Sequence, residues 1–319
     1  MVEEAKKEKR RKILVTGSAG MLGTALCAEF ARHHDVFALD IKKPRALGPG
    51  IRAFFECDIT EREETLKAIK AANPDLIIHA AALADVDGCE INPGRARNIN
   101  VNGTESVALS ASELGALLIY LSTDFVFDGA KRAAYKEEDT PRPLSVYGMT
   151  KLEGERVVGK LKKYIILRTS WLFGARGKNF VDAIIEKAQD RAELKVVDDQ
   201  TGSPTYAPDL AEAIRKAFEG IWDDTPGQGA GAVYHVSNKG QVTWFDYAKK
   251  ITELAGLEHV VLQPITSGEL ARPAKRPHFS ALDNGKFEKD TGVAMRPWQE
   301  ALSGYIKEKK DERHRRAKT

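Results

Sequence analysis

Short stretches made almost entirely of apolar residues alternate, along the first half of the chain, with longer segments whose apolar residues recur at helical spacing. A strand buried on both faces is apolar at every position, whereas an amphipathic helix is apolar along one stripe, so the alternation predicts strands separated by helices. This order is typical of an α/β fold with a doubly wound, parallel sheet of the Rossmann type. The predicted strands span residues 12–17, 35–40, 52–58, 75–82, 115–123 and 164–171.

The alternation loosens after residue 171. Helical spacing predicts helices near 179–191 and 207–220, and a single clear helix, at 243–257, in the region that follows. We expect this half to complete the sheet in part and to build a smaller C-terminal lobe. The predicted larger domain comprises 12–169 with 202–237, the lobe comprises 170–201 with 238–306, and charged tails cover 1–11 and 307–319.

The formal charge of +3 comes from the two ends of the chain. Residues 1–12 carry six basic and three acidic side chains, and residues 307–319 carry seven and three, so the body between them is slightly acidic. Such charged tails are expected to be solvated and disordered. Nucleic-acid binding would need basic and aromatic residues interleaved in the folded part, so we expect no nucleic-acid partner.

The apolar runs are too short to cross a bilayer, and no apolar block follows the N-terminal charges as in a secretory signal. We therefore expect a cytoplasmic protein with no membrane partner. The three cysteines, Cys27, Cys57 and Cys89, lack the spacing of a zinc site or a disulfide framework. They are expected to be packing residues, and the sequence predicts no metal site.

Three glycines, Gly17, Gly20 and Gly23, follow the first predicted strand and lead into the first predicted helix. Glycine lets the backbone turn tightly and approach a pyrophosphate, and a helix N-terminus offers N–H groups to phosphate oxygens. The GxxGxxG spacing alone also suits a plain tight turn. Its position favours dinucleotide binding, and so does Asp40 at the end of the second strand, where an acidic side chain can hold the adenosine ribose.

The preference between NAD and NADP stays open. The Asp40 carboxylate favours NAD, because it would repel the 2′-phosphate of NADP. The cations that follow, Lys42, Lys43 and Arg45, could offset this repulsion or form an ordinary solvated loop. Asp58 follows the third strand at the edge where ligands of such sheets collect, and it could also cap the next helix.

Tyr147 and Lys151, one helical turn apart, follow the fifth predicted strand. In a dinucleotide-binding sheet they can face the nicotinamide and a substrate carbonyl, with Tyr147 as proton donor and Lys151 lowering the tyrosine pKa and binding the cofactor ribose. Thr123 ends that strand and could hydrogen-bond the carbonyl, although a β-branched residue is also ordinary in a strand. His79, inside the fourth apolar run, is expected to be a packed core residue.

A series of motifs, in order along residues 12–300, resembles the dTDP-4-dehydrorhamnose reductase family of extended short-chain dehydrogenases/reductases. GxxGxxG, the threonine after strand five and YxxxK are the general pattern. The more specific segments are PDLIIHAAALADVDGCE, NVNGT, LSTDFVFDG, PLSVYGMTKLEGE, LRTSWLFG, DQTGSPTY, HVSN and RPHFSALD. The resemblance implies an NAD(P)-binding domain and a lobe for a dTDP-sugar, with reduction of the C4 ketone of dTDP-4-dehydro-L-rhamnose by NADPH or NADH. Magnesium accompanies some family members, but no carboxylate cluster places an ion here, and a homodimer is compatible with the sequence.

The resemblance also implies roles for individual residues. Tyr147 is the implied proton donor, and Lys151 is its partner and a ribose ligand. Thr123 and Asp124 are implied beside the sugar, which Trp171 would touch. The implied cofactor contacts, with the glycines of the loop, are Met21, Leu22, Asp40, Asp58, Ile59, Ala81, Ala82 and Leu83.

Two positions depart from the family pattern, which often has a tyrosine at Phe125 and a polar residue at Ala84. A reductase or epimerase of another nucleotide sugar therefore stays an alternative, whereas a dehydratase is disfavoured because no second acid follows Asp124. A non-catalytic NADP-binding regulatory subunit resembling the β subunit of methionine adenosyltransferase is a further alternative. The intact segments DQTGSPTY and RPHFSALD argue against it.

Overall fold

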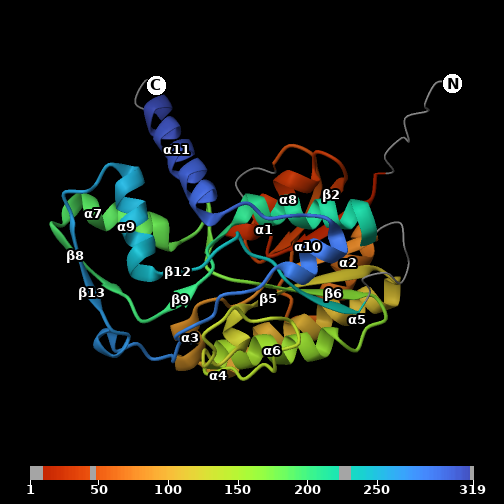
Figure 1. Cartoon of the computed structure of the whole chain (residues 1–319). Helices are drawn as coiled ribbons and strands as arrows, with labels where there is room; N and C mark the ends of the chain where they lie inside the picture. The colour runs from red at the N-terminus through yellow and green to blue at the C-terminus, as the bar shows by residue number, and fades with distance from the viewer. Residues whose placement is uncertain (1–9, 44–47, 223–230, 317–319) are drawn as a thin grey trace.

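A parallel sheet forms the centre of the computed structural model, which describes residues 10–43, 48–222 and 231–316 (Figure 1). Its strands are β1 (Lys12–Thr16), β2 (Asp35–Asp40), β3 (Ile51–Glu56), β4 (Leu76–His79), β5 (Leu117–Thr123), β6 (Tyr164–Thr169) and β11 (Ala232–His235). They lie in the order β11-β6-β5-β4-β1-β2-β3, and every pairing is parallel. The predicted doubly wound fold is confirmed, and the order reverses between β1 and β4, where ligands of such sheets bind.

Helices cover both faces of the sheet, because successive strand residues point to opposite sides. One layer contains α1 (Met21–Phe30), α8 (Ala207–Ala217) and α10 (Gly285–Thr291), and the other contains α2 (Arg62–Ala72), α5 (Thr104–Leu114) and α6 (Val146–Val158). In β1, Ile13 and Val15 pack with the first layer, whereas Leu14 packs with the second. This is why the strands read as continuous apolar runs.

A smaller lobe follows β6 and is completed by the chain after β11 (left side of Figure 1). Its elements are β7 (Leu172–Phe173), α7 (Phe180–Asp190), β8 (Glu193–Val197), β9 (Thr201–Gly202), β10 (Thr205–Tyr206), β12 (Val242–Thr243), α9 (Trp244–Ala255), β13 (Val261–Ile265) and α11 (Trp298–Arg316). β8 pairs with β13, β7 with β10 and β9 with β12. Phe173, Tyr247 and Trp298 belong to a separate apolar cluster, so the lobe has a core of its own.

Short helical segments connect or extend these elements. They are α3 (Val86–Ile91), α4 (Pro93–Arg97), the π-helical η1 (Asn98–Gly103) and η3 (Phe218–Trp222), and the 3-10 turns η2 (Asp124–Val126) and η4 (Gly268–Leu270). The strand predicted at 75–82 ends at His79, and the one predicted at 164–171 ends at Thr169. The residues just beyond these strands therefore lie in loops.

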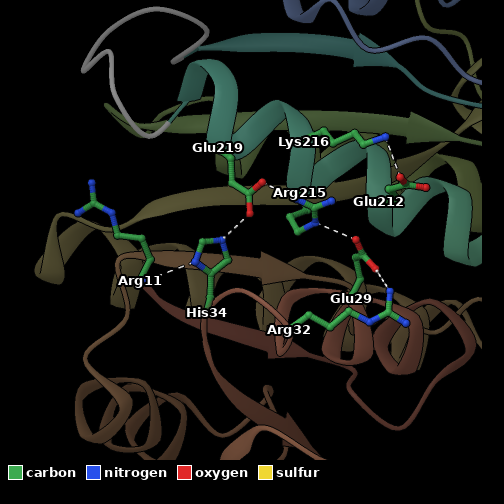
Figure 2. Close-up of polar contacts among 8 residues, drawn as sticks. All are labelled: Arg11, Glu29, Arg32, His34, Glu212, Arg215, Lys216 and Glu219. Carbon is green, nitrogen blue, oxygen red and sulfur yellow. Dashed lines mark hydrogen bonds and ion pairs between the residues drawn. The ribbon is translucent and has the colours of Figure 1, made fainter. Parts of the chain in front are cut away.

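A polar network fixes the end of α1 against α8 (Figure 2). Arg215 of α8 donates a hydrogen bond of 2.7 Å to Glu29 of α1 and also pairs with Glu219. The Nε2 atom of His34, which follows α1, lies 3.0 Å from Glu219. Its Nδ1 atom accepts a hydrogen bond from the backbone of Arg11, 3.4 Å long. The helix that follows the glycine loop is thus held firmly at its far end.

The C-terminal tail differs from the sequence prediction. Residues 307–316 are not disordered but continue α11. Glu308 accepts a hydrogen bond of 2.8 Å from Tyr206, and Lys309 pairs with Asp182 at 2.6 Å. Partners from the lobe thus stabilise a segment whose own composition predicted a solvated tail. The helix α10 was also missed, since seven residues show little periodicity, and residues 1–9 of the other tail lie outside the described residues.

Buried single residues behave as predicted. All three cysteines are buried and free. His79 is completely buried, with its ring nitrogens 2.7 Å from the Thr16 hydroxyl and 3.1 Å from the Thr104 hydroxyl, and burial lowers its pKa to about 3. It is a satisfied core residue. Within the described part of the chain, no helix is long and apolar enough to span a membrane.

Candidate active site

A cleft of about 1420 Å³ follows the carboxyl edge of the sheet and continues into the lobe. Its lining includes Gly17 after β1, Thr123 at the end of β5 and Trp171 after β6, and in the lobe Phe180 and Val196. Ligand pockets commonly measure ~300–1,000 Å³. The cleft therefore has room for two ligands next to each other.

The glycine loop forms one wall of this cleft. Gly17 has a φ of +68°, and a Cβ atom there would lie 2.6 Å from the backbone nitrogen of Ala81. A Cβ atom at Gly23 would lie 2.0 Å from the Gly17 carbonyl oxygen, so α1 packs directly on the loop. Gly20 is the N-cap of α1 and supplies no side-chain cap, which leaves the N–H groups of the first turn to a ligand. This geometry fits a diphosphate, and the residues of the loop and first turn that line the cleft are Gly17, Gly20, Met21, Leu22 and Gly23.

Asp40 and Asp58, predicted to bind the cofactor ribose and adenine, do not line the cleft, and their carboxylates accept hydrogen bonds from the backbone. Asp40 accepts a hydrogen bond of 2.9 Å from the backbone nitrogen of Ala19, so its carboxylate also fixes the glycine loop. Asp58 accepts hydrogen bonds of 2.9 Å from both the backbone nitrogen and the hydroxyl of Thr60. It forms a turn ahead of α2 and is not the N-cap, which is Glu61.

The remaining predicted cofactor residues divide between cleft and core. Ala82 lines the cleft. Ala81 packs against the glycine loop, and the Leu83 backbone nitrogen donates to Asn100 at 2.8 Å. Ile59 is only 4% exposed and packs in the core. Any contact of Ile59 with adenine would therefore involve its backbone rather than its side chain.

The loop after β2 bears on cofactor preference. Lys42 and Lys43 are exposed, and Arg45 lies outside the described residues. The Lys42 backbone nitrogen donates a hydrogen bond of 3.0 Å to Asp40. The Asp40 carboxylate therefore accepts hydrogen bonds from two backbone N–H groups, of Ala19 and of Lys42.

The end of β5 fixes α6 through consecutive residues. The Lys151 ammonium group donates a hydrogen bond of 2.7 Å to the carbonyl oxygen of Leu121. The next residue, Ser122, donates a hydrogen bond of 2.5 Å to Glu155, which lies one helical turn beyond Lys151 on α6. β5 thereby sets the position of the face of α6 that carries Lys151.

Tyr147 lies on the cleft side of α6, next to the end of β5. The Tyr147 hydroxyl lies near the side chain of Thr123, and the centre of its ring lies 5.7 Å from that of Phe125 in an edge-on arrangement. Burial raises the pKa of Tyr147 far above its ordinary value, and the charge of Asp124 adds to this, while the Thr123 side chain acts in the opposite direction. The tyrosine therefore carries its proton at neutral pH. The expectation that Lys151 lowers the pKa of Tyr147 is therefore wrong for this structure, in which burial raises it.

Burial and a neighbouring carboxylate have opposite effects on the pKa of Lys151. Its side chain is 3% exposed, and burial lowers its pKa to about 7, whereas the charge of Glu155 acts to raise it. The ammonium nitrogen also lies 4.1 Å from the centre of the Tyr120 ring, a favourable cation–π distance. A lysine with this pKa responds to small changes in neighbouring charge.

Asp124 connects the sheet edge to the RPHFSALD segment. One carboxylate oxygen accepts a hydrogen bond of 3.0 Å from Thr123, and the other accepts 2.6 Å from Ser280. Asp124 is 2% exposed, and burial raises its pKa to about 6 although both hydroxyl donors act to lower it. No local pattern indicates the role of Ser280, because its contact with Asp124 joins residues 156 positions apart in the chain.

Replacing Asp124 with Asn should change how stability depends on pH. The folded-state pKa of about 6 is raised above the ordinary value of 3.8, so the contribution of Asp124 is complete below the lower value and is lost as the pH rises through the higher one. Relative to Asp124→Asn, the natural protein should lose about 2–3 kcal/mol of unfolding free energy between about pH 4 and about pH 7. Denaturant titrations at both pH values measure this, and an unchanged difference would refute the raised pKa.

Trp171 lines the cleft two residues beyond β6. Its φ of +45° lies in the left-handed region, which costs a bulky residue about 1–3 kcal/mol. Its ring stacks on Trp244, with 3.4 Å between the ring centres and 5° between the planes. Trp244 was not predicted as a site residue, because the helical spacing around it indicates only an amphipathic helix.

Exposed cations line the part of the cleft that lies in the lobe. None of them forms an ion pair with another described residue, and a negatively charged ligand would supply the missing partner. Their spacing along the chain shows no pattern that indicates a shared role. They are Lys178, Lys187, Arg191, Lys195 and Lys275.

The described residues offer no ready metal site. No group of three or more His, Cys, Asp or Glu side chains among them is arranged to hold a metal ion. A magnesium ion is therefore not assigned to the cleft.

Comparisons with known proteins identify the family of this chain. Residues 11–310 match the model of the RmlD substrate binding domain. The chain is 36% identical to the spore coat polysaccharide biosynthesis protein SpsK of Bacillus subtilis (strain 168), over 93% of this chain and 98% of that protein. It is 37% identical to a dTDP-4-dehydrorhamnose reductase of Aggregatibacter actinomycetemcomitans, over 91% and 97%. The crystal structure of a dTDP-4-dehydrorhamnose reductase from Bacillus anthracis in complex with NADP superposes with a TM-score of 0.84 at 34% identity, covering 94% of this chain and 100% of that one.

Proposed function

This chain belongs to the dTDP-4-dehydrorhamnose reductase family, the family of the RmlD substrate binding domain, and from that membership we propose that it reduces the C4 ketone of dTDP-4-dehydro-L-rhamnose to give dTDP-L-rhamnose. The observation that carries the proposal is the position of Tyr147. Tyr147 lines the same cleft as Thr123 and the glycine loop. A proton donor and a dinucleotide-binding loop are the two parts that a ketone reduction needs.

A bound nicotinamide would supply the hydride. The chain itself supplies the proton, which the developing alkoxide takes from the Tyr147 hydroxyl in the cleft. Thr123 orients the tyrosine. Its own hydroxyl proton points to Asp124, so it would polarise the ketone only by turning that proton from Asp124 to the substrate.

Lys151 is placed to serve the cofactor. Its ammonium group uses one donor for the Leu121 carbonyl oxygen, and two donors remain for ribose hydroxyls. The N–H groups at the start of α1 would bind the cofactor diphosphate. The carboxylate oxygens of Asp40 remain the expected acceptors for the ribose hydroxyls. Both NADPH and NADH are therefore proposed as donors.

The dTDP-sugar is proposed to lie with its diphosphate toward the cations of the lobe, among them Lys187 and Arg191. The sugar would then reach Thr123 and Tyr147 at the sheet edge. Phe125 and Ala84, the two departures from the family pattern, both line the cleft. Neither side chain can offer the sugar the hydroxyl or polar contact that the family often has at its position. The identity of the sugar is therefore proposed together with the reaction.

An assay of the purified protein tests the function. Reduced cofactor is mixed with dTDP-4-dehydro-L-rhamnose, and the loss of nicotinamide absorbance is followed with NADPH and NADH in parallel. Reactions without ketosugar, and with a small panel of other nucleotide 4-ketosugars, are the controls. We expect cofactor oxidation that depends on the dTDP-sugar, with dTDP-L-rhamnose as product.

Failure of the assay has two distinct forms. Oxidation with a different ketosugar would leave a nucleotide-sugar reductase and change only the substrate. Cofactor binding without oxidation by any ketosugar would reject the enzyme and favour a non-catalytic NADP-binding subunit, which should bring a stoichiometric partner from a cell extract.

A further inference from the structure

The ring of Trp171 is confined on two sides. One face stacks on Trp244, with 3.4 Å between the ring centres. On another side lies Gly202 of β9, where a Cβ atom would come within 2.4 Å of the Trp171 ring. The left-handed backbone at Trp171 is unfavourable by itself, so the contacts around the ring must maintain it.

Trp244 is in turn fixed by its own neighbours. Phe180 packs against it with 4.4 Å between ring centres. Its indole N–H donates a hydrogen bond of 3.2 Å to the side-chain oxygen of Gln200. The side-chain NH₂ group of Gln200 donates a hydrogen bond of 2.6 Å to the Ser267 hydroxyl. That hydroxyl in turn donates a hydrogen bond of 2.6 Å to Asp199. A chain of polar contacts thus orients Trp244, and the stack passes that orientation to Trp171.

The stack lies where the sugar is proposed to bind. Thr169, two residues before Trp171, pairs with Thr123 across β5 and β6. Trp171, Trp244 and Gln200 all line the cleft, together with Tyr147. A change in the angle of the Trp171 ring would therefore change the shape of the cleft beside the reacting groups.

We propose that Trp244, oriented by Gln200, is a positioning residue that holds Trp171 in place as a wall of the sugar site. The inference rests on the proposed function for the identity of the ligand, but not for the stack itself. The proposal also assigns a role to the DQTGSPTY segment. Gln200 of that segment contacts Trp244, and Gly202 contacts Trp171.

Circular dichroism can detect the stack directly, since two closely stacked indoles give an exciton couplet in the far ultraviolet. Trp244→Leu, which keeps an apolar side chain, should abolish the couplet, and so should Trp244→Phe, which keeps a ring but not the second indole. Trp222→Phe is the matched control, because Trp222 lies outside the cleft lining and stacks on Tyr234 instead. We expect it to leave the couplet unchanged.

Ligand binding separates positioning from simple loss of structure. Titration with dTDP-L-rhamnose should show affinity on the order of tenfold weaker for Trp244→Leu, with a smaller loss for Trp244→Phe, whose ring can still support Trp171. NADPH affinity should be unchanged in both variants, because the glycine loop belongs to the other part of the molecule. Unchanged NADPH binding also shows that the variants are folded.

The inference would be overturned by a couplet that persists in Trp244→Leu, or by a lost couplet with undiminished affinity for dTDP-L-rhamnose in both variants. Equal loss of NADPH and sugar-nucleotide affinity would do so as well, since it indicates a general structural role. If the natural protein binds dTDP-L-rhamnose but does not reduce the ketosugar, only the proposed function fails, because the titration involves no chemistry.

Discussion

Tyr147→Phe is expected to lower turnover on the order of a hundredfold or more while leaving cofactor affinity unchanged. The Tyr147 phenol lines the cleft beside Thr123 and carries its proton at neutral pH. Removing one oxygen takes away the proton donor but keeps the ring, which packs edge-on to Phe125. Single-turnover and steady-state measurements of cofactor oxidation give the effect, and a titration with NADPH gives the affinity.

Tyr234→Phe is the matched control for this experiment. Tyr234 lies on β11, and its hydroxyl donates to Asp290 at 3.3 Å, outside the cleft lining. The same chemical change there should leave turnover unchanged. Full activity of Tyr147→Phe would remove Tyr147 from the mechanism, whereas reduced NADPH affinity would assign it to cofactor binding.

Glu155→Gln is expected to lower the free energy of unfolding by about 3–5 kcal/mol, the cost of leaving one charge of a buried ion pair without its partner. Glu155 accepts two hydrogen bonds from Arg168, of 2.7 and 2.9 Å, and a third from Ser122. Both charged side chains are at most 6% exposed. An amide in place of the carboxylate leaves the guanidinium group buried and unneutralised. Denaturant unfolding measures the loss.

The exposed pair Arg97–Glu153 provides the matched control on the same helix. Glu153→Gln makes the same chemical change next to an arginine, but solvent screens that pair, so a loss of at most about 1 kcal/mol is expected. Adding Arg168→Met to Glu155→Gln should recover part of the stability, because no unpaired charge then remains. Strictly additive losses in the double variant would contradict a coupled pair.

Glu155→Gln should also change the protonation of Lys151 in the active site. Its charge acts to raise the pKa of Lys151, which burial lowers to about 7. Without that carboxylate, Lys151 should be neutral over more of the neutral pH range. The pH profile of any activity in Glu155→Gln should therefore fall at a lower pH than in the natural protein.

Local sequence was sufficient for the central strands of the sheet because both helix layers bury them. The runs at 12–17 and 35–40 are apolar throughout for that reason, and they became β1 and β2. The short helix α10 and the extension of α11 were different. They owe their stability to contacts such as Tyr206 with Glu308, which no local pattern contains.

The site divides in the same way. The sequence by itself determined the glycine loop and the pair Tyr147 and Lys151, because each rests on spacing along one turn or one helix. Tertiary structure alone decided that Asp124 meets Ser280, that Glu155 neutralises Arg168 and that Trp244 stacks on Trp171. These contacts join segments far apart in the chain, and they exist only because the sheet and the lobe bring those segments together.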